Sequence, residues 1–307
     1  MKERLISKAV IPVAGYGTRL LPVTKSQPKE MRPIVDKPAV QYVVREAIDS
    51  GVESILFVTG RGKRAIEDYF DYAVELELEL ENKGKLDLLQ EVRDIGDMIR
   101  IFYVRQKLQK GLGDAVYQAK RFINDSPFAV LLADDIIDST DPVLRQMIDL
   151  YRKRPGIILA VTRIPQEEIS QWGVIKGKEI GKGTFKVEDM IEKPDPGEAP
   201  SDLAIIGRYI LTPSIFEAIE KVSPGKGGEI QLTDSIRSLL KKEEIYAYEF
   251  QGTYYGVGDK IGFLKANVAY ALKRKDIGDE LKGCLLYTSD AADARLCVDL
   301  GCSRLIK

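Results

Sequence analysis

Short apolar runs alternate with longer amphipathic stretches along the first half of the chain. The runs are rich in β-branched and aromatic residues, which is typical of buried strands in a parallel sheet. These predicted strands are residues 9–13, 54–58, 99–104 and 128–132. Helical periodicity separates them, at residues 40–50, 61–70 and 112–122. This alternation predicts an α/β fold whose doubly wound, mostly parallel (mixed) sheet has right-handed crossovers.

The segment from Asp71 to Leu80 is consistent with two structures. Glu and Leu alternate from Glu75 to Glu81, which is the period of a strand. Both residue types are strong helix formers, so we predict a helix.

The second half of the chain continues with strands and helices. We expect strands at 157–161, from Trp172, at 186–191 and at 201–207, then helices at 230–240 and 259–282. We interpret residues 1–283 as one domain with a first half to about residue 155, a second half to about 258, and a C-terminal helix at about 259–283.

A glycine-rich turn follows the first predicted strand. Gly15 and Gly17 allow positive φ and a close approach of the backbone, and Arg19, Lys25 and Lys29 follow. Backbone donors with nearby cations are what a polyphosphate needs. The pattern matches neither a dinucleotide fingerprint nor a Walker loop, and a tight structural turn is the alternative.

Composition narrows the possible chemistry. Among 307 residues, 46 Lys and Arg nearly balance 47 Asp and Glu, which argues against nucleic acid or an anionic membrane as partners. The sequence has neither an apolar run of ~20 residues nor a signal-peptide pattern, so we expect a cytoplasmic protein. The absence of histidine excludes His-based triads and His metal sites. All three cysteines lie in the last stretch.

The composition changes abruptly after residue 283. We interpret residues 284–307 as a non-native read-through tail, with a natural C-terminal tail as the alternative.

Carboxylates occur at two strand-to-turn transitions. Asp134 and Asp135 follow the strand 128–132, and Asp259 follows Tyr255-Gly-Val-Gly258. Carboxylate oxygens at such positions suit Mg²⁺, although capping of a turn or helix is the alternative role.

Three motifs carry a family resemblance. Gly15-Tyr-Gly-Thr-Arg19, Pro28-Lys-Glu-Met31 and Pro33-Ile-Val-Asp-Lys-Pro38 resemble the signature of the sugar-1-phosphate nucleotidylyltransferases. Residues 59–68 and 228–234 are more similar to the bacterial UTP:glucose-1-phosphate uridylyltransferase branch than to the thymidylyl branch. The resemblance covers about residues 8–283.

The resemblance implies roles for particular residues. Catalytic cations would be Arg19, Lys29 and Lys193. Nucleotide contacts would come from Ala14, Gly15, Gly17, Thr18, Gln106 and Gly111. The amide of Gln106 can both donate to and accept from the imide edge of uracil. Sugar contacts would come from Gly173, Glu192 and Lys193, so that the second half is the sugar-binding half. Asp134 and Asp259 would hold the catalytic Mg²⁺.

The sequence departs from the usual family pattern at several positions. Ala133 replaces a glycine, Asp114 a histidine, Arg32 a leucine and Asp202 an asparagine. Asp114 excludes a His-dependent contact, and Asp202 could alter contacts to sugar hydroxyls. We expect Arg32 to lie on the surface.

The implied reaction is Mg²⁺-dependent uridylyl transfer from UTP to glucose 1-phosphate, which gives UDP-glucose and pyrophosphate. An anionic phosphate nucleophile needs no general base, so a protein without histidine can catalyse this step. Three alternatives stay open: thymidylyl transfer, a nucleotide-sugar-dependent glycosyltransferase, and a non-catalytic nucleotide-sugar sensor. The relatives implied by the resemblance form homo-oligomers, and we expect the same here.

Overall fold

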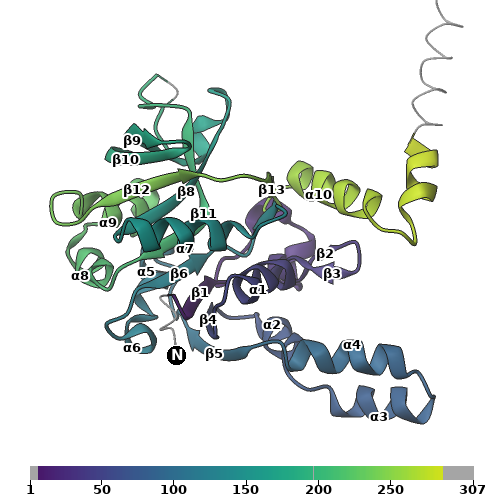
Figure 1. Ribbon diagram of the computed structural model, residues 1–307. Helices are drawn as coiled ribbons and strands as arrows, with labels where there is room; N and C mark the ends of the chain where they lie inside the picture. The colour runs from purple at the N-terminus through teal and green to yellow at the C-terminus, as the bar shows by residue number, and fades with distance from the viewer. Residues whose placement is uncertain (1–5, 196, 286–307) are drawn as a thin grey trace, which may run out of the picture.

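A nine-stranded mixed sheet runs through the protein (Figure 1), and its strand order is β5-β4-β1-β6-β11-β8-β12-β10-β9. The computed structural model describes residues 6–195 and 197–285. The strands of the first half are β1 (Lys8–Pro12), β4 (Ser54–Thr59), β5 (Arg100–Arg105) and β6 (Phe128–Leu131). Those of the second half are β8 (Ile157–Arg163), β9 (Gly173–Gly181), β10 (Thr184–Glu192), β11 (Leu203–Leu211) and β12 (Ile245–Glu249).

Strand direction divides this sheet. Strands β5, β4, β1 and β6 are parallel, as the alternation of strands and helices predicts. Strand β11 pairs antiparallel with both β6 and β8, and the β9–β10 hairpin is also antiparallel. The prediction of a doubly wound, mixed sheet is therefore confirmed, with the first half parallel and the second half combining parallel and antiparallel pairs.

Helices cover both faces of the sheet. One face is covered by α1 (Ala39–Asp49), α2 (Arg64–Tyr69) and α7 (Val143–Lys153). The other is covered by α5 (Leu112–Tyr117), α6 (Lys120–Ile123), α8 (Ser214–Lys221) and α9 (Leu232–Ser238). Strand β1 contributes to both layers, because Val10 packs on the second face while Ala9 and Ile11 pack on the first. This is a doubly wound arrangement.

Two helices project from the body as a hairpin (Figure 1): α3 (Val74–Asn82) and α4 (Leu86–Gly96). The prediction of a helix rather than a strand in this segment is confirmed despite the period of two, although the helix begins at Val74 rather than Asp71. Helix α4 is not among the predicted elements. It packs against α3, and Arg93 Nε lies 3.0 Å from Glu77 Oε2.

The C-terminal region differs from the prediction in one respect. Helix α10 (Lys260–Leu272) ends well before residue 282, and a turn precedes a second helical stretch at residues 278–285. The predicted helix 112–122 is likewise divided into α5 and α6. Of the predicted tail, residues 286–307 lie outside the described part of the chain, and Cys284 is exposed.

Two small antiparallel sheets complete the fold. Strands β2 (Pro33–Ile34) and β3 (Lys37–Pro38) form one, and β7 (Asp135–Asp138) and β13 (Thr253–Gly256) form the other. Among residues 6–195 and 197–285, no helix combines the length and apolar character that crossing a bilayer requires.

Candidate active site

The candidate site lies where parallel strands end. Strands β5, β4, β1 and β6 are neighbours in the sheet, so the loops that follow them meet at one edge. These loops contain the glycine-rich turn, Lys63, Gln106 and Asp134. Gly17 has a φ of 68° at the start of a short 3₁₀ helix, Thr18–Leu20, and thus adopts the left-handed conformation predicted for it.

Lys29 and Asp134 form an ion pair at this edge. Lys29 Nζ lies 2.6 Å from Asp134 Oδ2, and the two side chains are 19% and 21% exposed. Burial by itself would lower the pKa of Lys29, but the charges of Asp134 and Glu30 outweigh it and raise that pKa. Burial by itself would raise the pKa of Asp134, but Lys29 holds it below its usual value. The pair is therefore fully charged at neutral pH.

A second, deeper ion pair stands behind the first. Glu30 is 1% exposed and Lys63 6% exposed, and Lys63 Nζ lies 2.7 Å from Glu30 Oε2. Burial raises the pKa of Glu30 and lowers that of Lys63. Lys63 is the residue just before α2, and Glu30 directly follows Lys29 in the sequence. The ion pair therefore attaches the turn that contains Lys29 to the start of α2.

The register of β7 with β13 brings Asp259 close to Asp134. Gly256 pairs with Asp135, so the residue before β7 lies next to the residues after β13. Val257 N donates to the Asp134 carbonyl at 2.8 Å. A Cβ on Gly258 would lie 2.7 Å from Asp134 Oδ2 and 3.1 Å from Arg19 Nη2. A glycine is thus required where Asp134 and Arg19 converge.

The carboxylates of Asp134 and Asp259 fit a magnesium ion that also binds phosphate. Asp259 is the N-cap of α10, and its Oδ1 accepts from Gly262 N at 2.9 Å. Within the described ranges, no group of three or more acidic or cysteine side chains is close enough to hold a metal. Mg²⁺ commonly binds one or two carboxylates and takes its other ligands from water and substrate phosphates. The donor set at this edge is of that kind.

Asp135 points the other way, into the protein. Its carboxylate accepts from Tyr254 Oη at 2.7 Å and from Gly207 N at 2.9 Å. Burial and the neighbouring charge of Asp134 raise the pKa of Asp135 to about 6. The adjacent carboxylates therefore have different roles, because Asp134 faces the cations and Asp135 joins β7 to β11 and β13.

Gln106 is buried at the mouth of the loop that follows β5. Its Nε2 donates to the carbonyl of Gly111 at 3.2 Å and to Asp114 Oδ2 at 2.7 Å. Gly111 has a φ of 105°, and a Cβ there would lie 2.7 Å from the Ile230 carbonyl. Asp114 thus orients the amide of Gln106. Since both amide hydrogens are used inside the loop, Oε1 is the atom left to accept from a base.

The predicted sugar residues gather around the start of β9. Glu192 pairs with Gly173 in the β9–β10 hairpin, and its Oε2 accepts from Thr233 Oγ1 at 2.6 Å. Lys193 Nζ lies 3.4 Å from Glu192 Oε1, and the Lys193 backbone has a φ of 48°. A Cβ on Gly173 would lie 2.9 Å from Thr233 Oγ1 and 3.0 Å from Glu192 Oε2. The structure therefore brings these three predicted residues together.

Two contacts connect the residues predicted to bind the sugar to the rest of the site. Trp172 packs edge-on against Tyr254, with ring centroids 5.5 Å apart, and Tyr254 contacts Asp135. Ile230 exchanges backbone hydrogen bonds with Lys110 and Gly113, which joins the loop of Gln106 to the start of α9.

Sequence reasoning did not identify several residues of this site. These are Glu30, Lys63, Thr233, Tyr254 and the Arg208–Glu46 pair. Each forms a hydrogen bond to a residue 33 to 162 positions away in the sequence, namely Lys63 to Glu30, Thr233 to Glu192, Tyr254 to Asp135 and Arg208 to Glu46. A local motif gives no signal for such contacts. A charged residue inside an apolar run, as Arg208 is within β11, is the one hint available from sequence.

The departures from the family pattern have partners in the structure. Asp202 accepts from Arg163 Nη1 at 2.9 Å, in an exposed ion pair that also includes Glu249. Arg32 is half-buried rather than on the open surface, because its guanidinium lies 3.4 Å from the centre of the Phe263 ring. Burial lowers the pKa of Arg32.

Comparison with known proteins identifies the class. The family model described as nucleotidyl transferase matches residues 8–273. The chain belongs to this family, and its fold is the Rossmann-like α/β fold of nucleotidyltransferases.

Within this family, the sequence and the structure of the chain are similar to those of one group of enzymes. The chain is 50% identical over 277 residues to a UTP–glucose-1-phosphate uridylyltransferase of Staphylococcus epidermidis, covering 90% of this chain and 96% of the relative. A structure of UDP-glucose pyrophosphorylase complexed with UDP-glucose matches with a TM-score of 0.81 and 46% identity, over 88% of this chain and 100% of that one. A structure of a UTP-bound UGPase from Acinetobacter baumannii matches with a TM-score of 0.85 and 40% identity, over 92% of this chain and 99% of that one.

The buried Glu30–Lys63 pair generates a prediction about stability. Replacing Lys63→Met leaves the Glu30 carboxylate buried without its counter-charge, which should lower the free energy of unfolding by about 3–5 kcal/mol. Urea unfolding followed by circular dichroism measures this change. The double variant Glu30→Gln with Lys63→Met should recover most of the loss. A single variant as stable as the wild type would contradict the role of the pair.

Proposed function

We propose that the chain is a UTP:glucose-1-phosphate uridylyltransferase, which makes UDP-glucose and pyrophosphate. The observation that carries this proposal is the convergence of the glycine-rich turn, Lys29 and Asp134 at the edge of the parallel strands. The chain is about 50% identical to named uridylyltransferases over most of its length, which supports the same conclusion.

The reaction forms one bond and breaks one bond. A phosphate oxygen of glucose 1-phosphate attacks the α-phosphorus of UTP, and the bond from that phosphorus to the β-bridging oxygen breaks. Pyrophosphate leaves with the electron pair of the broken bond. Because the nucleophile is already anionic, the chain needs to align the two anions and compensate their charge.

Three cations are proposed to compensate that charge. Arg19 is exposed and reaches Gly258, beside Asp134. Lys29 runs past Gly15, whose Cβ position lies 4.0 Å from Lys29 Cε, so its ammonium is near the turn that would hold the phosphates. Lys193 is beside Glu192 on the sugar side. The backbone of Ala14, Gly15, Gly17 and Thr18 would hold the nucleotide.

Mg²⁺ is the proposed cofactor, and Asp134 and Asp259 are the residues that would hold it. When bound, the ion supplies positive charge to the phosphate oxygens of UTP. Asp134 is held in place for this role by the Val257 amide, and Asp259 by the N-terminus of α10.

Recognition of the two substrates is proposed to use separate parts of the site. Gln106 Oε1 would accept from the imide N–H of uracil, and Gly111 would let the backbone close over the base. Gly173 leaves room for the hexose, and Glu192, oriented by Thr233, would accept from sugar hydroxyls.

We also infer that the protein is a cytoplasmic homo-oligomer. Helix α10 supports the inference of a homo-oligomer, because its outward side carries an apolar stripe at helical spacing. Its members Ile261, Leu264, Val268 and Leu272 are 62%, 56%, 39% and 40% exposed. Sedimentation of the purified protein measures the assembly.

The first test of function is an assay of pyrophosphate release. With Mg²⁺, glucose 1-phosphate and UTP, the protein should release pyrophosphate and form UDP-glucose, and dTTP should support a slower reaction. Faster turnover with dTTP would assign thymidylyl transfer instead. Binding of UDP-glucose without any release would indicate a sensor, and turnover that consumes UDP-glucose with an acceptor would indicate a glycosyltransferase.

The proposed metal ligands generate a second prediction. Asp134→Asn or Asp259→Asn should reduce kcat by about 10²–10³-fold, because charge compensation at the phosphates is lost. Thermal melting should show that both variants remain folded. Asp138→Asn is the matched control, since Asp138 is at the far end of β7 and contacts Lys273 instead. Near-wild-type turnover in either variant at ordinary Mg²⁺ would remove that residue from the metal site.

The proposed sugar site generates a third prediction. Gly173→Ala should raise the KM for glucose 1-phosphate by about 10-fold, because the added methyl group would displace Glu192 or Thr233. The KM for UTP should change much less. Gly181→Ala, at the other end of β9, is the control, since the nearest atom to its Cβ would be 3.9 Å away. An equal effect on both KM values would argue against a site specific for the sugar.

A further inference from the structure

Arg208 lies fully buried in the middle of the sheet, behind the loop that carries Asp134. Its side chain is 0% exposed. It has five N–H groups, and acceptors surround all of them. Nη1 donates to the carbonyls of Leu132 at 3.3 Å and Gly207 at 2.9 Å, and Nη2 donates to the carbonyl of Asp135 at 2.8 Å. The guanidinium thus bonds to the backbone on both sides of Ala133 and Asp134.

An irregularity in β11 places the guanidinium there. Ile206 pairs with Ala160 and Tyr209 with Leu159, so Gly207 and Arg208 have no counterparts on β8. The backbone of Gly207 forms hydrogen bonds with the loop that carries Asp134 instead of with β8. Its N–H donates to Asp135 Oδ2, and its carbonyl accepts from Leu132 N at 2.8 Å. A Cβ at Gly207 would lie 2.3 Å from Asp135 Oδ2, which requires a glycine.

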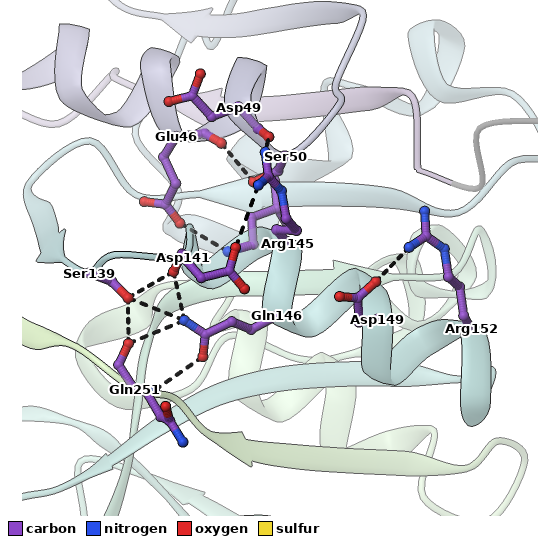
Figure 2. Close-up of polar contacts among 11 residues, drawn as sticks. Glu46, Asp49, Ser50, Ser139, Asp141, Arg145, Gln146, Asp149, Arg152 and Gln251 are labelled. Carbon is purple, nitrogen blue, oxygen red and sulfur yellow. Dashed lines mark hydrogen bonds and ion pairs between the residues drawn. The ribbon is translucent and has the colours of Figure 1, made fainter.

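Glu46 compensates the buried charge of Arg208. Its carboxylate accepts from Arg208 Nε at 3.1 Å and from Nη2 at 2.8 Å. Glu46 belongs to α1, and its Oε1 also accepts from Leu144 N in the first turn of α7 at 3.1 Å. Figure 2 shows Glu46 extending from α1 toward the start of α7. Two helices therefore fix the carboxylate that orients the guanidinium.

The start of α7 also holds the small sheet that follows Asp134. Gln146 Nε2 donates to the Gln251 carbonyl at 3.2 Å, and Gln251 N donates back to Gln146 Oε1 at 3.1 Å. Ser139 Oγ donates to the same carbonyl at 2.6 Å, as Figure 2 shows. Ser139 follows β7 and Gln251 precedes β13, so the ends of both strands are attached to α7.

We propose that Arg208 is a positioning residue for Asp134, and that Glu46 is its orienting partner. The guanidinium holds the Leu132 and Asp135 carbonyls, so that the Asp134 carboxylate is presented at the site whether or not Lys29 remains bound to it. This inference rests on the proposed metal role of Asp134. A residue that only stabilised the fold would affect unfolding without affecting metal affinity.

The experiment measures Mn²⁺ binding in the presence of UTP and the absence of glucose 1-phosphate, by electron paramagnetic resonance of free Mn²⁺. Arg208→Lys keeps the charge but cannot reach all its acceptors from one nitrogen. It should weaken Mn²⁺ binding by about 10–100-fold, the usual effect of losing an outer-shell partner. Glu46→Gln should weaken it in the same direction. The Mg²⁺ concentration for half-maximal turnover should rise in parallel, while the KM for glucose 1-phosphate stays within about 2-fold.

Two reference variants separate the possible outcomes. Ile219→Ala in α8 is the control for lost stability, because Ile219 is buried in the core of the opposite face. It should leave Mn²⁺ affinity unchanged. Asp134→Asn tests the proposed ligand itself. If Asp134→Asn weakens Mn²⁺ binding but Arg208→Lys and Glu46→Gln do not, the positioning role is wrong. If Asp134→Asn has no effect, the proposed metal site is wrong.

Discussion

The ion pair between Lys29 and Asp134 joins the two segments on which the site depends. One is the turn after the glycine-rich loop, and the other is the end of β6. Their charges do not stand alone, because Glu30 and Lys63 continue the alternation inward and Arg19 lies on the outer side near Gly258. Alternating charges keep each ion close to a counter-ion, which offsets the large cost of partial burial. Substrate phosphates would enter a site whose cations are already oriented.

This arrangement explains how a chain without histidine can be an enzyme of this class. A reaction that needs a general base requires a group with a pKa near neutrality, and histidine most often provides it. Lys29 and Asp134 are shifted in the opposite sense, since each pKa moves away from neutrality. Such groups keep their charge and do not exchange protons at physiological pH. The site is suited to aligning anions and compensating their charge.

Much of the fold could be predicted from the sequence, because the apolar runs and glycine-rich turns are local signals. The strands from β1 to β6 and the order of helices between them follow from those signals. The pairing of β7 with β13 does not, since the two strands are more than 100 residues apart and each is short. That pairing is what brings Val257 and Gly258, the residues just before Asp259, against Asp134. The resemblance suggested Asp134 and Asp259, and the register of β7 with β13 gives the physical reason why the segments that carry them are adjacent.

The unusual residues show how local departures are accommodated. Asp114 is a hydrogen-bond partner within the loop after β5, because its carboxylate accepts from Gln106. Asp202 forms an ion pair with Arg163, and a carboxylate cannot donate a hydrogen bond as an amide does. Arg32 stacks on Phe263 of α10, which attaches the segment after Lys29 to the helix that Asp259 caps. A cation is attracted to the face of an aromatic ring, which stabilises this contact. Arg32 therefore connects the segment that carries Lys29 to the helix that begins after Asp259.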